Sequence, residues 1–118
     1  MGLKGNTKYE KDMDILVQVL PNEYDLSLTN VSIKHVISDV GELHYDYVTL
    51  KCRVNYSLNG KKQGKRKIIF VSYDTKDGVL EICGEYKEYK FTELGFEFVE
   101  VCFEKPQLTG ISVYIKEL

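Results

Sequence analysis

Tryptophan is absent from this chain of 118 residues, and cysteine occurs only three times. The cysteines, Cys52, Cys83 and Cys102, stand far apart and form no C-x-x-C pair. Such spacing is unlike a disulfide framework, and it is unlike a structural zinc site, which uses closely spaced ligand pairs. We therefore expect three reduced cysteines that are buried, because each lies in an apolar run and free cysteine packs as a small apolar side chain.

Long apolar runs are missing as well. No stretch approaches the ~20 apolar residues that a membrane-spanning helix needs, and the polar N-terminus lacks the apolar centre of a signal peptide. The net charge of −2 favours neither a polyanion nor a polycation as partner. These absences predict a cytoplasmic protein without a membrane span, and the alternative is an exported protein whose signal sequence is not part of this chain.

Motifs that carry chemistry are also absent. The chain has neither a G-x-S-x-G nucleophile turn nor a glycine-rich phosphate loop. Residues 74–78 read Asp-Thr-Lys-Asp-Gly, which lacks the ligand spacing of a calcium loop. The only histidines are His35 and His44, and His35 alternates with apolar neighbours, as a core or interface histidine does. We therefore predict no cofactor, no metal and no catalytic residue.

Strand patterns dominate what is present. Residues 68–83 hold two runs rich in Ile, Val, Phe and Tyr around an Asp77-Gly78 break, which predicts a hairpin. Residues 47–58 alternate apolar and polar side chains and end at the turn dipeptide Asn59-Gly60, so they predict a long strand. We expect this strand to form a further hairpin with the strand from Ile68, joined by residues 61–67.

Other segments complete the pattern. In residues 96–103 the apolar positions change parity, which indicates a β-bulge or burial on both faces. Residues 8–20 fit a strand or a helix, and their Ile and Val content favours a strand. Further strand-like segments are residues 26–28 and 31–37 (one strand or two), 85–90 (a short edge strand or a loop) and 111–115.

Many short strands without intervening helices favour an all-β fold. We predict one antiparallel β-sandwich over residues 1–118, with residues 1–11 as a loose N-terminal segment and a possible helix near the N-terminus as the open alternative. The alternation predicts these core residues: Val48, Leu50, Val54, Ile69, Val71, Val101, Ile111 and Val113.

One segment resembles a known family. Phe70-Val71-Ser72-Tyr73-Asp74, followed by Asp77-Gly78, is similar to the F-x-L-Y-D signature of bacterial FxLYD-type domains, with Ser72 in place of leucine. The resemblance implies an immunoglobulin-like sandwich in which a strand ends in Tyr-Asp, turns at a glycine and pairs with the next strand. It implies no catalytic residues, because that family shares none, and members of the family are largely exported.

Basic residues and tyrosines supply the candidate binding residues. Residues 61–67 carry five positive charges, and we expect a solvated hairpin tip that protects the sheet and is dispensable for the fold. No aromatic residue is interleaved for base stacking, which disfavours nucleic acid. The candidate partner surface consists of Tyr45, Tyr47, Tyr86, Tyr89, Lys61, Lys62, Lys65, Arg66 and Lys67.

Together these features favour a non-enzymatic interaction or accessory module whose partner is another protein. Pairing between copies through a sheet edge stays open. The first alternative is a module that binds carbohydrate or nucleic acid through the tyrosines or the basic segment. The second alternative is a small enzyme of unknown chemistry.

Overall fold

The computed structural model describes residues 5–76, 79–104 and 108–117, with the backbone alone for residues 75, 76 and 79–83. In this part of the chain every regular element is a β-strand, so the helix considered near the N-terminus is wrong. The strands are β1 (Thr7–Asp12), β2 (Leu16–Val19), β3 (Ser27–Val40), β4 (Leu43–Asn55), β5 (Gly64–Lys76), β6 (Val79–Phe91), β7 (Phe96–Phe103) and β8 (Gly110–Lys116).

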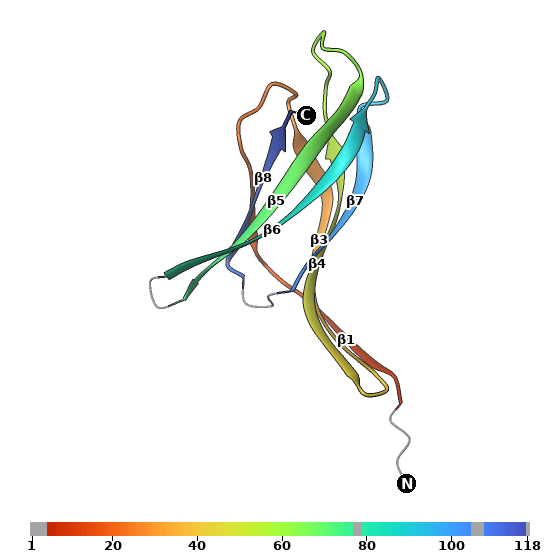
Figure 1. Ribbon diagram of the computed structural model, residues 1–118, viewed down its shortest axis with the longest axis vertical. Coiled ribbons are helices and arrows are strands. Elements are labelled where there is room, and N and C mark those ends of the chain that lie inside the picture. Colours follow the sequence, from red (N-terminus) through yellow and green to blue (C-terminus); the bar gives the residue numbers. More distant parts are fainter. Residues whose placement is uncertain (1–4, 77–78, 105–107, 118) are drawn as a thin grey trace.

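The strands form two four-stranded sheets (Figure 1). The first sheet has the order β1-β3-β4-β7, and the second has the order β2-β8-β5-β6. All pairs are antiparallel except β2 with β8, which is parallel. The prediction of an all-β chain built mainly from antiparallel strands is therefore confirmed, although the second sheet is mixed.

Two hairpins join strands that follow each other in the chain. Strands β3 and β4 reverse between Val40 and Leu43, where Gly41 has a φ of 59°. A glycine with positive φ at the first position of a two-residue loop is typical of a type II′ turn. Strands β5 and β6 pair from Lys76↔Val79 to Gly64↔Phe91, which confirms the predicted hairpin, although its turn lies outside the described residues.

Strand β3 is one strand with an irregularity rather than two strands. Its register with β4 shifts between Thr29 and Ser32, and Asn30 within that step has a φ of 54°. Asparagine tolerates the left-handed region better than most residues, which explains its place at the bulge.

The expected hairpin between β4 and β5 is wrong, because the two strands lie in different sheets. The connecting segment crosses one end of the core. Tyr56 is buried there against Phe91, with the ring centroids 4.0 Å apart. The Tyr56 N–H donates to Gly95 O (2.9 Å), and the Ser57 N–H donates to Tyr24 O (2.7 Å). These contacts direct the chain across the core end instead of back along β4.

Strand β7 has no bulge. Its register with β4 is continuous from Val48↔Phe103 to Asn55↔Phe96. Val99, Val101 and Phe103 point into the core, whereas Phe98 points outward and is 69% exposed. The change of parity in the sequence therefore marks an aromatic residue on the outer face, not an extra residue in the strand.

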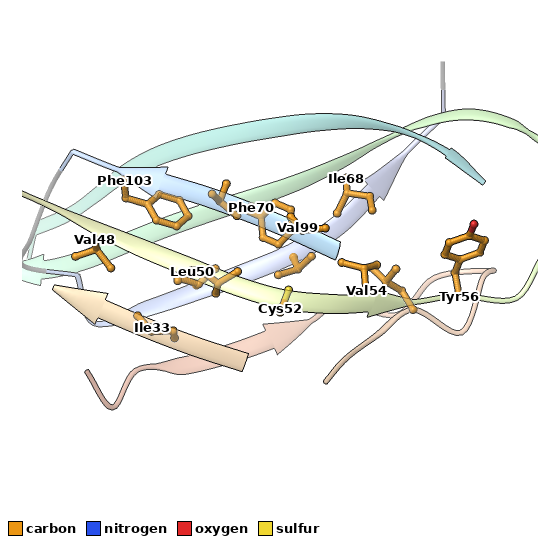
Figure 2. Packing of buried hydrophobic residues seen from close by; sticks show 14 of the residues in the cluster. Ile33, Val48, Leu50, Cys52, Val54, Tyr56, Ile68, Phe70, Val99 and Phe103 are labelled. Carbon is orange, nitrogen blue, oxygen red and sulfur yellow. The ribbon is translucent and has the colours of Figure 1, made fainter. Parts of the chain in front are cut away.

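The core lies between the two sheets and draws on both (Figure 2). Six of the predicted core residues are buried: Val48, Leu50, Val54, Val101, Ile111 and Val113. Ile69 and Val71 are only half-buried and belong to the outer face of β5, while Ile68 and Phe70 are fully buried. Residues 68–71 are all apolar, so alternation alone fits either assignment of faces.

The N-terminal residues pair at sheet edges. Residues 1–11 were expected to be loose, but Thr7–Asp12 form strand β1 along β3. All six side chains of this strand are exposed. Leu16–Val19 form β2, whose Val17 and Val19 pack against the core. The strand alternative for residues 8–20 is thus the one that the chain adopts.

Two neighbouring isoleucines test the assignment of faces. Ile68→Ala should lower the free energy of unfolding by about 2–5 kcal/mol, since it leaves a cavity in the core. Ile69→Ala should cost about 1 kcal/mol, because that side chain is already half in water. Urea denaturation of the two variants measures both costs, and a larger loss for Ile69→Ala would reverse the two faces of β5.

Candidate functional site

The structure divides the candidate partner surface among three places. Lys65, Lys67 and Tyr86 share the outer face of the second sheet, as the pairs Lys67↔Glu88 and Ile69↔Tyr86 require. Tyr45 and Tyr47 lie on β4, in the first sheet. Lys61 and Lys62 are exposed in the segment before β5. Two further candidates point inward as the pair Arg66↔Tyr89, so they are not surface residues.

The outer face of the second sheet combines tyrosines, aliphatic residues and lysines. Ile69 pairs with Tyr86 on one side and with Tyr114 on the other, so the three side chains form a row across three strands. Tyr86 is 60% exposed. We name this surface the lysine–tyrosine face, and it consists of Lys65, Lys67, Ile69, Val71, Tyr86, Glu88, Lys90, Tyr114 and Lys116.

Like charges oppose each other at one end of the lysine–tyrosine face. Lys65 stands directly opposite Lys90, and Lys67 directly opposite Lys116. Directly opposed like charges destabilise a sheet. Lys65 is relieved by Glu88 at 3.5 Å, and the Lys67 ammonium lies 4.7 Å from the ring centre of Tyr86.

Among the described residues Lys90 and Lys116 have no ion pair. Sequence reasoning missed both lysines, because only the pairing of β5 with β6 and β8 brings them to this face. Glu88 stands opposite Lys67 and pairs with Lys65, so it compensates part of the repulsion, and an anionic partner would offset the rest at Lys90 and Lys116.

The rest of the face is flat because its small residues carry little side chain. Gly84 pairs with Val71, and a Cβ added at Gly84 would meet only a backbone oxygen at 3.9 Å. Tyr73 lies over Gly110, where an added Cβ would come within 2.2 Å of the Tyr73 hydroxyl. The face is therefore a shallow platform rather than a cleft.

Arg66 holds the basic segment to the core. Its side chain is 9% exposed, and Nε donates to the Tyr24 hydroxyl (2.8 Å). Nη1 donates to Gly64 O (3.1 Å) and Nη2 to Lys62 O (2.7 Å). The guanidinium also lies 4.8 Å from the ring centre of Tyr24 and 5.4 Å from that of Phe91. The sequence suggested that residues 61–67 form a solvated tip throughout. That expectation is wrong for Arg66, which is buried and bound to the core.

Tyr24 and Arg66 share a further partner, the carboxylate of Glu117. The Tyr24 hydroxyl donates to Glu117, which also lies 3.5 Å from Arg66 Nε. Burial is the main reason that the pKa of Tyr24 is raised, and its bond to Glu117 adds to the shift. The cluster ties the start of β5 to the segment before β3 and to the C-terminal end of β8.

Replacing Arg66 tests this anchoring. Arg66→Gln should lower the free energy of unfolding by about 2 kcal/mol, because glutamine cannot keep the three charged hydrogen bonds. Lys62→Gln should change it by no more than about 0.5 kcal/mol, since the lysine side chain is exposed. Denaturant unfolding of the two variants measures the difference, and equal stability would mean that Arg66 anchors nothing.

The outer part of the β3–β4 hairpin, residues 36–47, projects beyond the rest of the molecule, with β1 along its edge (Figure 1). We call these residues the arm. Strand β7 ends opposite Val48, so the part of β4 from Leu43 to Tyr47 has no partner on that side within the described chain. Val40, Leu43 and Tyr45 are exposed, Leu43 to 57%. The arm thus presents apolar side chains to water.

Two histidine–aspartate pairs lie on the β3–β4 hairpin. A hydrogen bond joins His44 Nδ1 to Asp39 Oδ1 (2.6 Å), and the two residues stand directly opposite each other. Another joins His35 Nε2 to Asp46 Oδ1 (2.5 Å) diagonally across the strands. His35 is half-buried outside the core cluster. The bond to Asp39 raises the pKa of His44 above its ordinary value.

The pair of His44 with Asp39 predicts how the stability of the protein depends on pH. A raised pKa means that the bond stabilises the protein fully below pH 6.5, the ordinary pKa, and that this contribution is lost as the pH rises through the folded-state pKa. We expect an NMR titration midpoint above 6.5 for His44, returning toward 6.5 in Asp39→Asn. Asp12→Asn, on exposed β1, should leave the midpoint unchanged, and an unshifted wild-type midpoint would contradict the pair.

The outer face of the first sheet carries a second candidate surface. Arg53 lies 4.0 Å from the ring centre of Phe96, and the exposed Phe98 lies edge-on to that ring. Asn30, Arg53 and Phe98 border a shallow hollow of about 390 Å³. Within the part of the chain that the structure describes, Arg53 Nε is buried there without a hydrogen-bond partner.

The cysteines do not share one environment. Cys52 is buried, and burial raises its pKa to about 11. Cys102 is exposed on the outer face of the first sheet, so the expectation that it is buried is wrong. Partial burial of its thiol, together with the nearby carboxylates of Glu100 and Glu85, raises its pKa as well. The side chain of Cys83 lies outside the described residues. A raised pKa disfavours the thiolate, which is opposite to what a nucleophilic cysteine needs.

Comparisons of the chain with protein-family models, with curated proteins and with solved structures found no match. In the described residues no helix has the length and apolar character to cross a membrane. The same residues hold no group of three or more His, Cys, Asp or Glu side chains placed to bind a metal ion.

Proposed function

We propose that this protein is a non-enzymatic interaction module that binds another protein through the lysine–tyrosine face. The observation that carries the proposal is the charge pattern, in which two directly opposed lysine pairs border an apolar platform containing tyrosine. Tyrosine is enriched at protein interfaces, where its ring packs and its hydroxyl stays hydrogen-bonded. The lysines would select a partner segment with carboxylates beside apolar side chains.

The size of the face suits a short segment. Two inter-strand spacings, between β6, β5 and β8, make it about 10 Å wide, and the length of β8 makes it about 20 Å long. A standard interface buries about 800 Å² on each partner. A platform of this size is smaller, so we infer a hairpin, strand or helix as the bound element rather than a broad protein surface.

A nucleic acid or a sugar fits this face less well. Both would stack on an open aromatic ring, but the Lys67 ammonium occupies the space over the ring of Tyr86. Between the tyrosines the platform is aliphatic, through Ile69 and Val71. Aliphatic side chains accept other apolar side chains better than they accept bases.

The enzyme alternative is weakened by geometry. Cys102 and His44 both border a hollow of about 480 Å³ at the base of the arm. Cys102 stands opposite Thr49 on β4, five residues from His44. That separation is about 16 Å along a strand, too long for proton transfer between their side chains.

A second candidate function is the binding of a small ligand on the outer face of the first sheet. The buried Arg53 Nε without a partner favours it, because a ligand acceptor would satisfy that donor. The exposed ring of Phe98 could stack on a sugar or a base. This candidate corresponds to the carbohydrate or nucleic-acid alternative, with Arg53 and Phe98 as the binding residues in place of the tyrosines and the basic segment.

We also propose that the fold is immunoglobulin-like in its pairing but not in its chain order. The pairing β3-β4-β7 corresponds to strands D-E-B of an immunoglobulin domain, and β8-β5-β6 corresponds to C-F-G. After β1 and β2, which have no counterpart in this correspondence, the chain would run from strand D to strand C, as in a circular permutation. The FxLYD resemblance falls on β5 in this correspondence, and kinship with that family is part of the proposal.

Photo-cross-linking tests the binding face. We expect benzoylphenylalanine at Tyr86 to cross-link a protein in an extract of the source cells, and the same probe at Phe98 to yield no protein adduct. Lys65→Glu with Lys116→Glu should abolish the Tyr86 adduct, since the charge of the face is reversed. Adducts identified by mass spectrometry at Phe98 only, or a Tyr86 adduct that is indifferent to the lysines, would contradict the proposal.

A further inference from the structure

The arm is a projection that carries acidic residues and exposes the apolar side chains of Val40, Leu43 and Tyr45. Residues 36–47 contain Asp39, Glu42 and Asp46 and no lysine or arginine. Asp39 is hydrogen-bonded to His44, and Asp46 is hydrogen-bonded to His35. Val40 and Leu43 stand directly opposite each other beside Glu42, and both are exposed. Exposed apolar residues gathered on a projection indicate a contact surface.

The lysine–tyrosine face has the complementary composition. Its four lysines lie at one end, and Ile69, Val71 and the small residues follow along the strands. The arm carries carboxylates beside two aliphatic side chains, and the face carries ammonium groups beside an aliphatic platform. Charge and apolar character therefore match between two surfaces of the same chain.

We propose that the arm of one copy docks on the lysine–tyrosine face of a second copy. This inference rests on the proposed function of that face and names its occupant. Val40 and Leu43 pack on Ile69 and Val71, and the acidic turn at Glu42 faces the opposed lysine pairs. The two parts of the candidate surface that the structure separates, Tyr45 with Tyr47 and Tyr86 with the lysines, then meet between copies.

The dimensions agree with this docking. A two-stranded hairpin with its side chains is about 10 Å wide, and the arm beyond β7 is about 15 Å long. Both values match the platform, which is about 10 Å wide and about 20 Å long. In one molecule the arm projects away from the second sheet (Figure 1), so the contact forms only between copies. Each copy has one arm and one face, which generates a head-to-tail assembly.

Edge pairing through β1 is a different contact, and the lysines separate the two. Strand pairing uses backbone groups and does not involve the outer face of the second sheet. Only arm docking predicts that reversing the lysine charges blocks association.

Sedimentation velocity of the purified full chain tests the proposal. The wild type should show a sedimentation coefficient that rises with protein concentration and falls back at high salt. Leu43→Lys removes an apolar contact and places a cation against the lysines. Lys65→Glu with Lys116→Glu reverses the charge of the face. Each variant alone should sediment as a monomer at every concentration, with an unchanged circular dichroism spectrum.

Mixing the two variants gives the decisive result. The Leu43→Lys protein keeps a functional face, and the Lys65→Glu/Lys116→Glu protein keeps a functional arm. An equal mixture should therefore form a one-to-one dimer that grows no further. Phe98→Lys, which alters an exposed aromatic outside both surfaces, should associate as the wild type does.

Several outcomes would overturn the inference. They are a monomeric wild type at all concentrations, association that survives the lysine reversal, and a mixture that stays monomeric. A monomeric wild type together with a lysine-dependent Tyr86 adduct to a different protein would remove the second copy as occupant and leave the proposed function standing. Loss of that adduct as well would remove both.

Discussion

The alternation of side chains along β5 determines both the core and the candidate binding face. This strand lies between β8 and β6 in the second sheet. One of its faces places Arg66, Ile68 and Phe70 inside the protein. The opposite face places Lys67 and Ile69 on the surface. A shift of one residue would exchange the two sets, burying lysines and exposing Phe70, so the burial of one face fixes the register.

The register of β5 also places lysines directly opposite each other, which destabilises the sheet. The binding hypothesis gives these lysines a role. The same pairing that buries Phe70 between Val113 and Glu85 places Lys67 opposite Lys116. The fold tolerates this repulsion because apolar burial is worth more than the few tenths to 1 kcal/mol of a cross-strand charge pair. Among the described residues Lys90 and Lys116 have no ion pair, so their charge beside an apolar platform is available to a partner, and the acidic arm is one surface of the chain with the matching character.

The sequence predicts local structure well and sheet membership poorly. Alternation located the strand around Val54, the β5–β6 hairpin and β7 because these signals lie within a few residues. It could not show that β4 pairs with β7 and β5 with β8, since those contacts join distant segments. For the same reason it grouped Tyr45 with Tyr86 and missed Lys90 and Lys116. Arg66 looked like a surface residue because its partners, Tyr24 and Phe91, are brought to it only by folding.

Cross-strand nuclear Overhauser contacts in the isotope-labelled protein measure the register of β5, on which both the core and the binding face depend. We expect backbone proton contacts from Phe70 to both Val113 and Glu85, and from Ile69 to both Tyr114 and Tyr86. Contacts shifted by one residue, or contacts that join β5 to β4 as a hairpin, would contradict this register. Either result would move the lysines off the proposed face and remove the basis of the binding model.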